Sequence, residues 1–513
     1  MRIKRLFIVA LAFFAVNSYS TQLYAQGLED ALRYSSITNS GTARFVSMGG
    51  AFGALGGDFT SLSYNPAGLG VYRSSEFTIT PSFKNKSVDS DFAGNSYKDS
   101  RTRFAFDNIG IVTSFSNLKS EDKGLVMLNL GLGYNRMIDF NSESLAMGSN
   151  TQNSIMDYFA GKAYGFNYNN ITDTDSNDPF TSTYAPWDAI LAWNTFLIDT
   201  INGQTSSYWA SLNGGDGVDQ EQSISTNGSM GEFVIALASN FSNKFFFGGT
   251  IGIQNIYFRQ TSIHSETAFA SNNPLPNGDR FSSLQYKQTL AVDGNGFNFK
   301  IGAIYRPIPS LRVGLALHTP TYYSLNETYR ASMISNMLNG SWNLTSPRNR
   351  YDYTIESPYK MIGSLAFTLE EKGLISVDVE YLDYTSMRIG DGGDGNNFVN
   401  VNTQINNNLT STFNIKGGGE VWLGDFALRA GYALYGSPYE SGTLNEGNSI
   451  SVISGGLGYR IGETFIDFAY QRMMSNNSYY LYNLVNVDGS SAIDPVNQKI
   501  QQGKVLLTVG FKF

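Results

Sequence analysis

The chain has 513 residues, a formal net charge of −8 and no cysteine. Its acidic balance gives no basic footprint for a nucleic acid, and without thiols it can form neither disulfides nor thiolate metal sites. Aromatic residues make up 14% of the chain, charged residues only 15%, and glycine is abundant at 53 residues. This composition suits a membrane β-barrel, whose strands alternate in polarity and end in aromatic girdles. We expect no cofactor and no metal.

The first 25 residues are expected to be removed as a secretory signal peptide. A basic start at residues 1–5 precedes an apolar run at residues 6–16, and Ala25 offers a small residue for cleavage before Gln26. The apolar run is too short to cross a bilayer, and no later stretch reaches about 18 uninterrupted apolar residues. The alternative is that this segment is a buried helix of the mature protein. Export without a helical anchor fits a barrel that is inserted from the periplasm.

Residues 26–75 look like neither a strand pair nor a linker. Residues 27–36 are expected to form a short helix, and a glycine-rich run with Arg44 follows it. The segment closes with the sequence Asn65-Pro66-Ala67-Gly68-Leu69. Glycine at this density, together with an Asn-Pro turn, favours compact irregular backbone that packs at close range.

From Glu76 onward, strands alternate with two kinds of connection. Six connections are tight turns, near residues 116–123, 242–244, 307–310, 371–372, 424 and 462. Seven are long polar loops, near residues 84–103, 138–230, 260–287, 326–357, 386–410, 436–448 and 475–502. This alternation puts every turn on one side of a membrane and every loop on the other. We therefore predict an all-β fold, a transmembrane antiparallel β-barrel of about 14 strands over residues 76–513.

The strands also predict which side chains face lipid. In the last strand one face carries Val505, Leu507, Val509, Phe511 and Phe513. In the strand that begins at Gly373, the polar positions Ser376, Asp378 and Glu380 point into the lumen instead. Charges on the lipid face would cost several kcal/mol, so the lumen must be wet or internally paired. Such inward charges either pair across the lumen or bind a substrate.

The longest loop, residues 138–230, is large enough to carry function. It contains two helical patterns, one at residues 154–163 and one that begins at Pro186. Their apolar faces could form a satellite core that caps the barrel, or they could surround a ligand. We favour a hydrophobic capture site, because concave aromatic and aliphatic surfaces suit apolar ligands. The candidate ligand-binding side chains are Tyr158, Phe159, Trp187, Leu191, Trp193 and Leu197.

Three features together resemble the FadL/TodX-type outer-membrane transporters of long-chain fatty acids and other hydrophobic compounds. They are the small-residue segment with Arg44 and the Asn65-Pro66-Ala67 signature, the count of 14 strands directly after it, and the late pattern from Gly417 to Pro438. The resemblance implies that residues 26–75 form a hatch that plugs the periplasmic half of the barrel. The hatch and gating residues would be Arg44, Asn65, Pro66, Ala67 and Gly68.

In that family a kink in the third strand opens the wall laterally. The third strand here covers residues 124–136, and Asn129, Gly131 and Gly133 interrupt its alternation. Glycine inside a strand often marks a bend, although these glycines could equally relieve crowding inside the barrel. The terminal strand resembles the signal that the barrel-assembly machinery reads, which Phe511 and Phe513 would supply. Alternatively, Phe513 is merely the last apolar residue of an edge strand.

These patterns lead to one functional hypothesis and two alternatives. We expect passive transport of a hydrophobic small molecule in the outer membrane of a Gram-negative bacterium, with capture on the loop side and lateral release past the hatch. The expected partners are this ligand, outer-membrane lipid and the barrel-assembly machinery, and the protein is expected to be a monomer. The alternatives are a general porin, and an adhesin or structural barrel. An enzyme is not expected, since His264 and His318 lie in no recognisable catalytic arrangement.

Overall fold

The computed structural model describes residues 27–36, 38, 40–116, 123–201, 203–213, 215–276, 278–369, 372–395, 397–485 and 491–513. The predicted signal peptide lies outside the described residues. These residues form one antiparallel sheet of 19 strands and one small hairpin. None of the helices in the described ranges has the length and apolar character that a membrane crossing requires.

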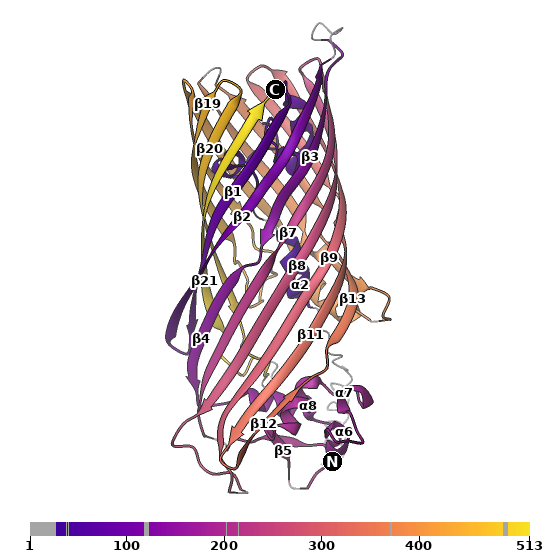
Figure 1. The fold of residues 1–513 in the computed structure, drawn as a ribbon, viewed down its shortest axis with the longest axis vertical. Coiled ribbons are helices and arrows are strands. Elements are labelled where there is room, and N and C mark those ends of the chain that lie inside the picture. Colours follow the sequence, from indigo (N-terminus) through magenta and orange to yellow (C-terminus); the bar gives the residue numbers. More distant parts are fainter. Residues whose placement is uncertain are drawn as a thin grey trace, which may run out of the picture.

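The large sheet closes into a barrel (Figure 1). Closure occurs because β1 (Glu76–Phe92) pairs with β2 (Asn95–Ser116) on one side and with β21 (Val496–Lys512) on the other. The wall then continues through β3 (Leu125–Asp139), β7 (Val218–Phe241), β8 (Phe245–Ala268) and β9 (Phe281–Ile308).

Each of the next three wall positions is shared by two shorter strands. They are β10 (Leu311–His318) with β11 (Tyr322–Met337), β14 (Lys360–Thr368) with β13 (Asn349–Glu356), and β15 (Gly373–Asp383) with β16 (Arg388–Asp391). The wall is completed by β17 (Ser411–Leu423), β18 (Phe426–Tyr435), β19 (Ile450–Ile461) and β20 (Thr464–Tyr479). Counted this way, the described residues form the predicted closed barrel of 14 wall strands.

The tight turns gather at one end of the barrel, as predicted. Between β7 and β8 the three-residue connection 242–244 includes Ser242 and Asn243, both with φ of 55°, the left-handed conformation of a type I′ turn. Gly424 and Gly462 supply positive φ at two other turns. The turns at residues 116–123 and 371–372 lie partly outside the described residues.

The long connections begin later than the polarity of the sequence suggests. Residues 84–103 were predicted as a loop, but β1 and β2 stay paired until Phe92 and Asn95 and turn only at Ala93 and Gly94. The reason is that a ladder satisfies backbone N–H and C=O groups whatever the side chains are. Polarity therefore marks the edge of the outward apolar band and not the end of the strand.

The predicted alternation of the wall is confirmed. Val505, Leu507 and Phe511 are exposed on the outer face, whereas Leu506 and Thr508 are fully buried inside. Ser376, Asp378 and Glu380 are likewise buried in the lumen. The terminal Phe513 also lies outside and donates its backbone N–H to Ser75 O at 3.0 Å.

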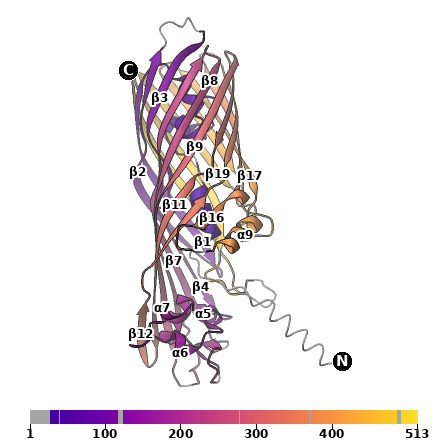
Figure 2. The same cartoon turned by 90° about the vertical axis from the view of Figure 1, so that its right-hand side faces the viewer.

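The loop end of the barrel carries a small helical domain (Figures 1 and 2). Its elements are β4 (Ser142–Asn150), α5 (Ile155–Ala163), α6 (Tyr168–Ile171), α7 (Pro179–Ser182), α8 (Trp187–Asn194), β5 (Ile198–Thr200), β6 (Tyr208–Ala210) and β12 (Gly340–Thr345). A further helix, α9 (Val399–Asn408), lies on the side of the barrel at mid-height, and η2 (Tyr384–Ser386) is a short 3₁₀ turn. The second predicted helix ends earlier than its apolar pattern does, because the chain turns at Phe196, where φ is 60°, and then forms β5.

The N-terminal segment lies inside the barrel. The predicted helix at residues 27–36 is α2 (Leu28–Ser35), which sits halfway along the lumen (Figure 1). The remaining elements, α3 (Ala43–Ser47), α4 (Ser61–Tyr64) and η1 (Pro66–Val71), occupy the half of the lumen near the tight turns. The described residues 40–75 are nearly all buried, so they form a plug.

Candidate functional site

Arg44 ties the plug to the barrel wall. Its guanidinium donates to Glu420 of β17 through Nε at 2.9 Å and Nη2 at 3.1 Å. Glu420 also accepts hydrogen bonds from Arg429 Nε and from Trp422 Nε1, the latter at 2.6 Å. Arg429 continues the network to Asp467 Oδ1 at 2.5 Å. A buried carboxylate shared by two guanidinium groups therefore joins α3 to β17 and β18, and through Asp467 to β20.

The Asn65-Pro66-Ala67 turn is fully buried against the opposite part of the wall. Asn65 Oδ1 accepts from the N–H of Ala67 at 3.1 Å, which caps η1, and Pro66 stands at the first position of that helix. Asn65 Nδ2 donates to Gly53 O at 2.5 Å. Gly68 packs where a side chain would collide with Ser61 and Gly56. This motif therefore fixes the backbone of the plug.

Pairs of glycines in adjacent strands let the plug touch the wall directly. Gly248 and Gly302 face each other in β8 and β9, and a Cβ on either would collide with Pro66 or Asn65. The pair Gly418 and Gly431 receives Met48 in the same way. Glycine is required at such close approaches. The half of the lumen near the tight turns is thus shaped to fit the plug, and we call this surface the socket.

Asn129, Gly131 and Gly133 belong to this socket. Asn129 Nδ2 donates to Leu69 O at 2.7 Å and to Tyr72 O at 3.2 Å, and a Cβ on Gly131 would collide with Leu62. The ladders of β3 with β2 and β7 run through all three residues without a shift.

The irregularities of β3 fall on either side of these residues, between Leu125 and Met127 and between Arg136 and Ile138. The ladder to β2 ends at the pair of Asn108 and Asn135. Beyond that pair, side chains of β2 reach Asn141 and β4, which follow β3 in the chain. Arg101 Nη1 lies 3.1 Å from Glu143 Oε1, and Arg103 Nε donates to Asn141 Oδ1 at 3.0 Å.

A polar chamber of about 310 Å³ lies in the lumen beside α2. Five basic and two acidic side chains line it, together with an apolar side formed by Met137, Ile138, Phe140 and Phe258. The rings of Phe140 and Phe258 meet edge to face at 5.2 Å. The basic side chains are Arg33, Lys84, Lys86, Arg136 and Lys504.

Of the five basic side chains in this chamber, Lys86 and Arg136 form no ion pair with a described residue, and Arg136 Nε donates to Phe106 O at 3.2 Å. Lys84 Nζ lies 3.3 Å from Asp139 Oδ1, and Lys504 Nζ lies 2.5 Å from Asp107 Oδ2. No ion pair joins Lys86 to any residue that the structure describes. The chamber therefore offers the same ligand an apolar wall and an ammonium group that has no ion-pair partner among the described residues.

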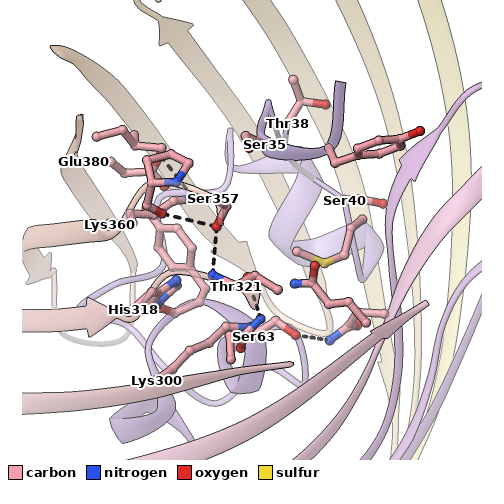
Figure 3. A pocket seen from close by; sticks show the side chains of 18 of the residues that line it. Ser35, Thr38, Ser40, Ser63, Lys300, His318, Thr321, Ser357, Lys360 and Glu380 are labelled. Atoms are coloured by element: carbon pink, nitrogen blue, oxygen red, sulfur yellow. Dashed lines mark hydrogen bonds and ion pairs between the residues drawn. The ribbon is translucent and has the colours of Figure 1, made fainter. Parts of the chain in front are cut away.

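A second, narrower cavity of about 80 Å³ adjoins the first, and the two share Thr38, Ser40 and Met137 (Figure 3). Its charges are paired within the wall. Lys300 Nζ lies 2.5 Å from Glu232 Oε1, and Lys416 Nζ lies 2.5 Å from Glu380 Oε1. Inward charges thus pair with each other, as one of the two interpretations of the sequence expected, but they pair between nearby strands of the wall and not across the lumen.

The six predicted ligand-binding residues come together, but in a packed core at the loop end. Phe159, Leu191 and Leu197 are fully buried, and Trp193 Nε1 donates to Thr172 Oγ1 at 2.8 Å. The ring of Phe159 meets Tyr286 of β9 edge to face at 5.3 Å. Tyr158 and Trp187 are partly buried and pack against the same core. These contacts favour the capping alternative, and the lumen chambers are lined by other residues.

Sequence reasoning missed Lys84 and Lys86. Their polar surroundings placed them in a loop, whereas both lie on β1 and line the lumen. The available signal was the alternation of Lys84, Lys86 and Val88 on one face of the strand. Both histidines form hydrogen bonds within the fold. His318 Nε2 lies 2.7 Å from Tyr64 O, and His264 lies between Gln222 and Glu266.

No protein-family model matches the chain, and no curated protein matches it in sequence. Among solved structures it is similar to a FadL homologue from Pseudomonas aeruginosa, with 13% identity and a TM-score of 0.55 over 93% of this chain and 99% of that one. It is also similar to the toluene transporter TodX from P. putida, with 13% identity and a TM-score of 0.52 over 92% of this chain and 98% of that one. The chain therefore has the fold of the FadL-type barrels, with a plug inside a wall of 14 strands.

Proposed function

We propose that this protein is a passive outer-membrane channel for hydrophobic small molecules, with long-chain fatty acids as the leading ligand class. The observation that carries the proposal is the chamber beside α2, where Phe140 and Phe258 face the same space as the unpaired Lys86. An amphipathic carboxylate matches both features. Burial of its chain supplies about 0.8 kcal/mol per CH₂ group, and the ammonium group balances its charge.

The plug supports release through the side of the barrel. A ligand that passed straight through would have to displace residues held by the buried network of Arg44, Glu420 and Arg429. It would also have to part the plug from the glycine pairs of the wall. A lateral route leaves these contacts intact. No part of this scheme needs an energy source.

The loop-end helices would admit the ligand to the barrel mouth. The core of this domain contains Phe159, Leu191 and Leu197, and Tyr158, Trp187 and Trp193 pack against it. We propose that local opening of this core exposes an apolar capture surface. Outer-membrane lipid would receive the ligand, and the terminal strand with Phe511 and Phe513 would recruit the barrel-assembly machinery.

Uptake of labelled oleate by cells that carry the intact gene, the deletion or Lys86→Gln tests the proposal. We expect uptake to depend on the gene and Lys86→Gln to reduce it, because the carboxylate loses its counter-ion. Lys98→Gln is the matched control, since Lys98 is well exposed on β2 and pairs with Asp89 at 3.5 Å. Uptake that is equal in the intact and deleted strains would refute the proposal.

Uptake of a neutral ligand distinguishes a channel for fatty acids from a channel for uncharged hydrocarbons. One of the structurally similar proteins is the toluene transporter TodX. If toluene is the ligand here, its uptake depends on the gene but not on Lys86, because toluene carries no charge. Large steady ion currents in planar bilayers would instead indicate a porin. An adhesin or structural barrel would give neither uptake nor current.

A further inference from the structure

Three neighbouring wall strands are interrupted at one level, four strands along the wall from β3. The ladder between β10 and β14 ends at the pair of His318 and Lys360, and the ladder between β11 and β13 begins at the pair of Tyr322 and Glu356. Residues 319–321 therefore face residues 357–359 outside any ladder. The same register places Pro320 opposite Pro358. Since proline has no N–H group, the ladder cannot continue between them.

The adjacent strand is interrupted beside this gap. The β14–β15 ladder ends at Lys360 and Leu382, and the β13–β16 ladder resumes at Glu356 and Arg388. The intervening residues of that strand include η2 (Tyr384–Ser386). The wall thus has a window bounded by two proline-containing segments and a 3₁₀ turn.

Few contacts hold the window shut. The N–H of Thr321 donates to Ser357 Oγ at 2.8 Å, and the N–H of Ser357 donates to Thr321 O at 3.1 Å (Figure 3). The facing residues 319–321 and 357–359 are threonine, serine and proline apart from Tyr359, which lies opposite Thr319 and whose ring contacts that of Tyr381. None of the six is charged, so an apolar chain that passes between them separates no ion pair of their own.

The window lies between a cavity and a groove. On the lumen side, Thr319, Thr321, Ser357 and Pro358 line the narrow cavity that adjoins the chamber of Lys86. On the outer side, the same strands form an apolar groove of about 720 Å³. Its walls include Ile301, Leu315, Leu317, Met361, Val379 and Tyr381.

Gly363 makes the floor of this groove. It pairs with Leu315 on one side and Val379 on the other, and both of these side chains are exposed on the outer face. A Cβ added to Gly363 would meet no atom within 4 Å. The glycine therefore serves no packing contact of its own, and its missing side chain leaves the space that the groove occupies.

We propose that this window is the principal lateral exit, through which the apolar chain of the ligand leaves the lumen and enters the groove at Gly363. The inference rests on the proposed function and specifies where release occurs. The gap between β2 and β3 suits an apolar chain less well. Beyond the end of their ladder, Arg101 of β2 pairs with Glu143 of β4, and Arg103 of β2 donates to Asn141, so passage would have to separate an ion pair.

A disulfide across the window tests the proposal. The chain has no native cysteine, so Thr321→Cys with Ser357→Cys gives a single defined bridge. Residues directly opposite in an antiparallel pair have Cα atoms roughly 4.5–5.5 Å apart, which a disulfide can span. The control is Asn85→Cys with Thr102→Cys, an in-register pair of β1 and β2 whose side chains already meet at 2.8 Å.

Oleate uptake by cells is then measured before and after reduction, with bridge formation checked by thiol labelling. We expect the oxidised window variant to take up oleate about tenfold more slowly, because a gating step sets the rate. Reduction should restore uptake, and the control should be unaffected in both states. A fully bridged window variant that transports at the rate of the unmodified protein would overturn the proposal.

Filling the groove gives a second test without a bridge. Gly363→Trp should slow uptake, whereas Gly455→Trp should not, since Gly455 also faces outward but lies on β19, away from the window. Equal uptake by these two variants would overturn the proposed path. These outcomes are distinct from failure of the proposed function, in which the unmodified protein itself would show no gene-dependent uptake.

Discussion

Replacement of Arg44 by alanine should loosen the plug without unfolding the barrel. The side chain of Glu420 is fully buried and would lose the two hydrogen bonds at 2.9 and 3.1 Å that Arg44 donates. Breaking a buried ion pair costs about 3–5 kcal/mol when the remaining charge is left alone. Glu420 keeps Arg429 and Trp422 as partners, so we expect a cost at the lower end, about 3 kcal/mol.

That cost in free energy raises the fraction of molecules in which the plug is undocked. Because about 1.4 kcal/mol corresponds to a tenfold change, the undocked plug should become roughly 100-fold more frequent. Planar-bilayer recordings should show the change as more frequent openings of purified Arg44→Ala protein. Arg306→Ala is the control, because Arg306 lies near the tight turns and contacts Pro309 O, not the plug. Opening frequencies that match the unmodified protein would refute the view that Arg44 holds the plug.

Three further perturbations have defined outcomes. Asn65→Ala removes the cap of η1 and the bond to Gly53, which should destabilise the plug by about 1–2 kcal/mol and accelerate hydrogen exchange at residues 66–71. Gly302→Ala should displace the plug by overlap with Asn65, at about 1–3 kcal/mol, whereas Gly363→Ala should leave thermal stability unchanged. Burial raises the pKa of Asp188 in α8. The loop-end domain should therefore be most resistant to proteolysis below the ordinary Asp pKa and lose resistance as pH rises through the raised value, a trend that Asp188→Asn should abolish.

The wall of this protein could be predicted from its sequence because a strand has a period of two. Lipid outside and a crowded lumen inside impose opposite demands on successive residues, and the last strand shows this in Val505, Leu506 and Leu507. The turns were predictable for a similar reason, since glycine and Asn243 are needed where φ is positive. Local sequence determines both features.

The interior could not be predicted in the same way. Alternation places Gly131 on the inner face and Gly363 on the outer face, but nothing local indicates that Leu62 of the plug fills the space beside Gly131 while the space beside Gly363 stays open. The difference depends on what lies across the lumen, far away in the sequence. Similarly, the apolar pattern around Trp187 and Leu191 fits a ligand site and a packed core equally well. Tertiary contacts with β9 and β11 decide between them.

The position of the plug determines where ligand specificity can reside. In the half of the barrel near the tight turns, inward groups such as Asn129, Asp378 and Arg312 donate to or accept from plug backbone. These groups are committed to the plug and cannot also select a ligand. The chamber that remains free is lined by residues such as Lys84 and Lys86, from strand segments whose polarity resembles that of a loop. We therefore expect related barrels with different ligands to differ most in these polar strand ends, while the plug contacts constrain only the fold.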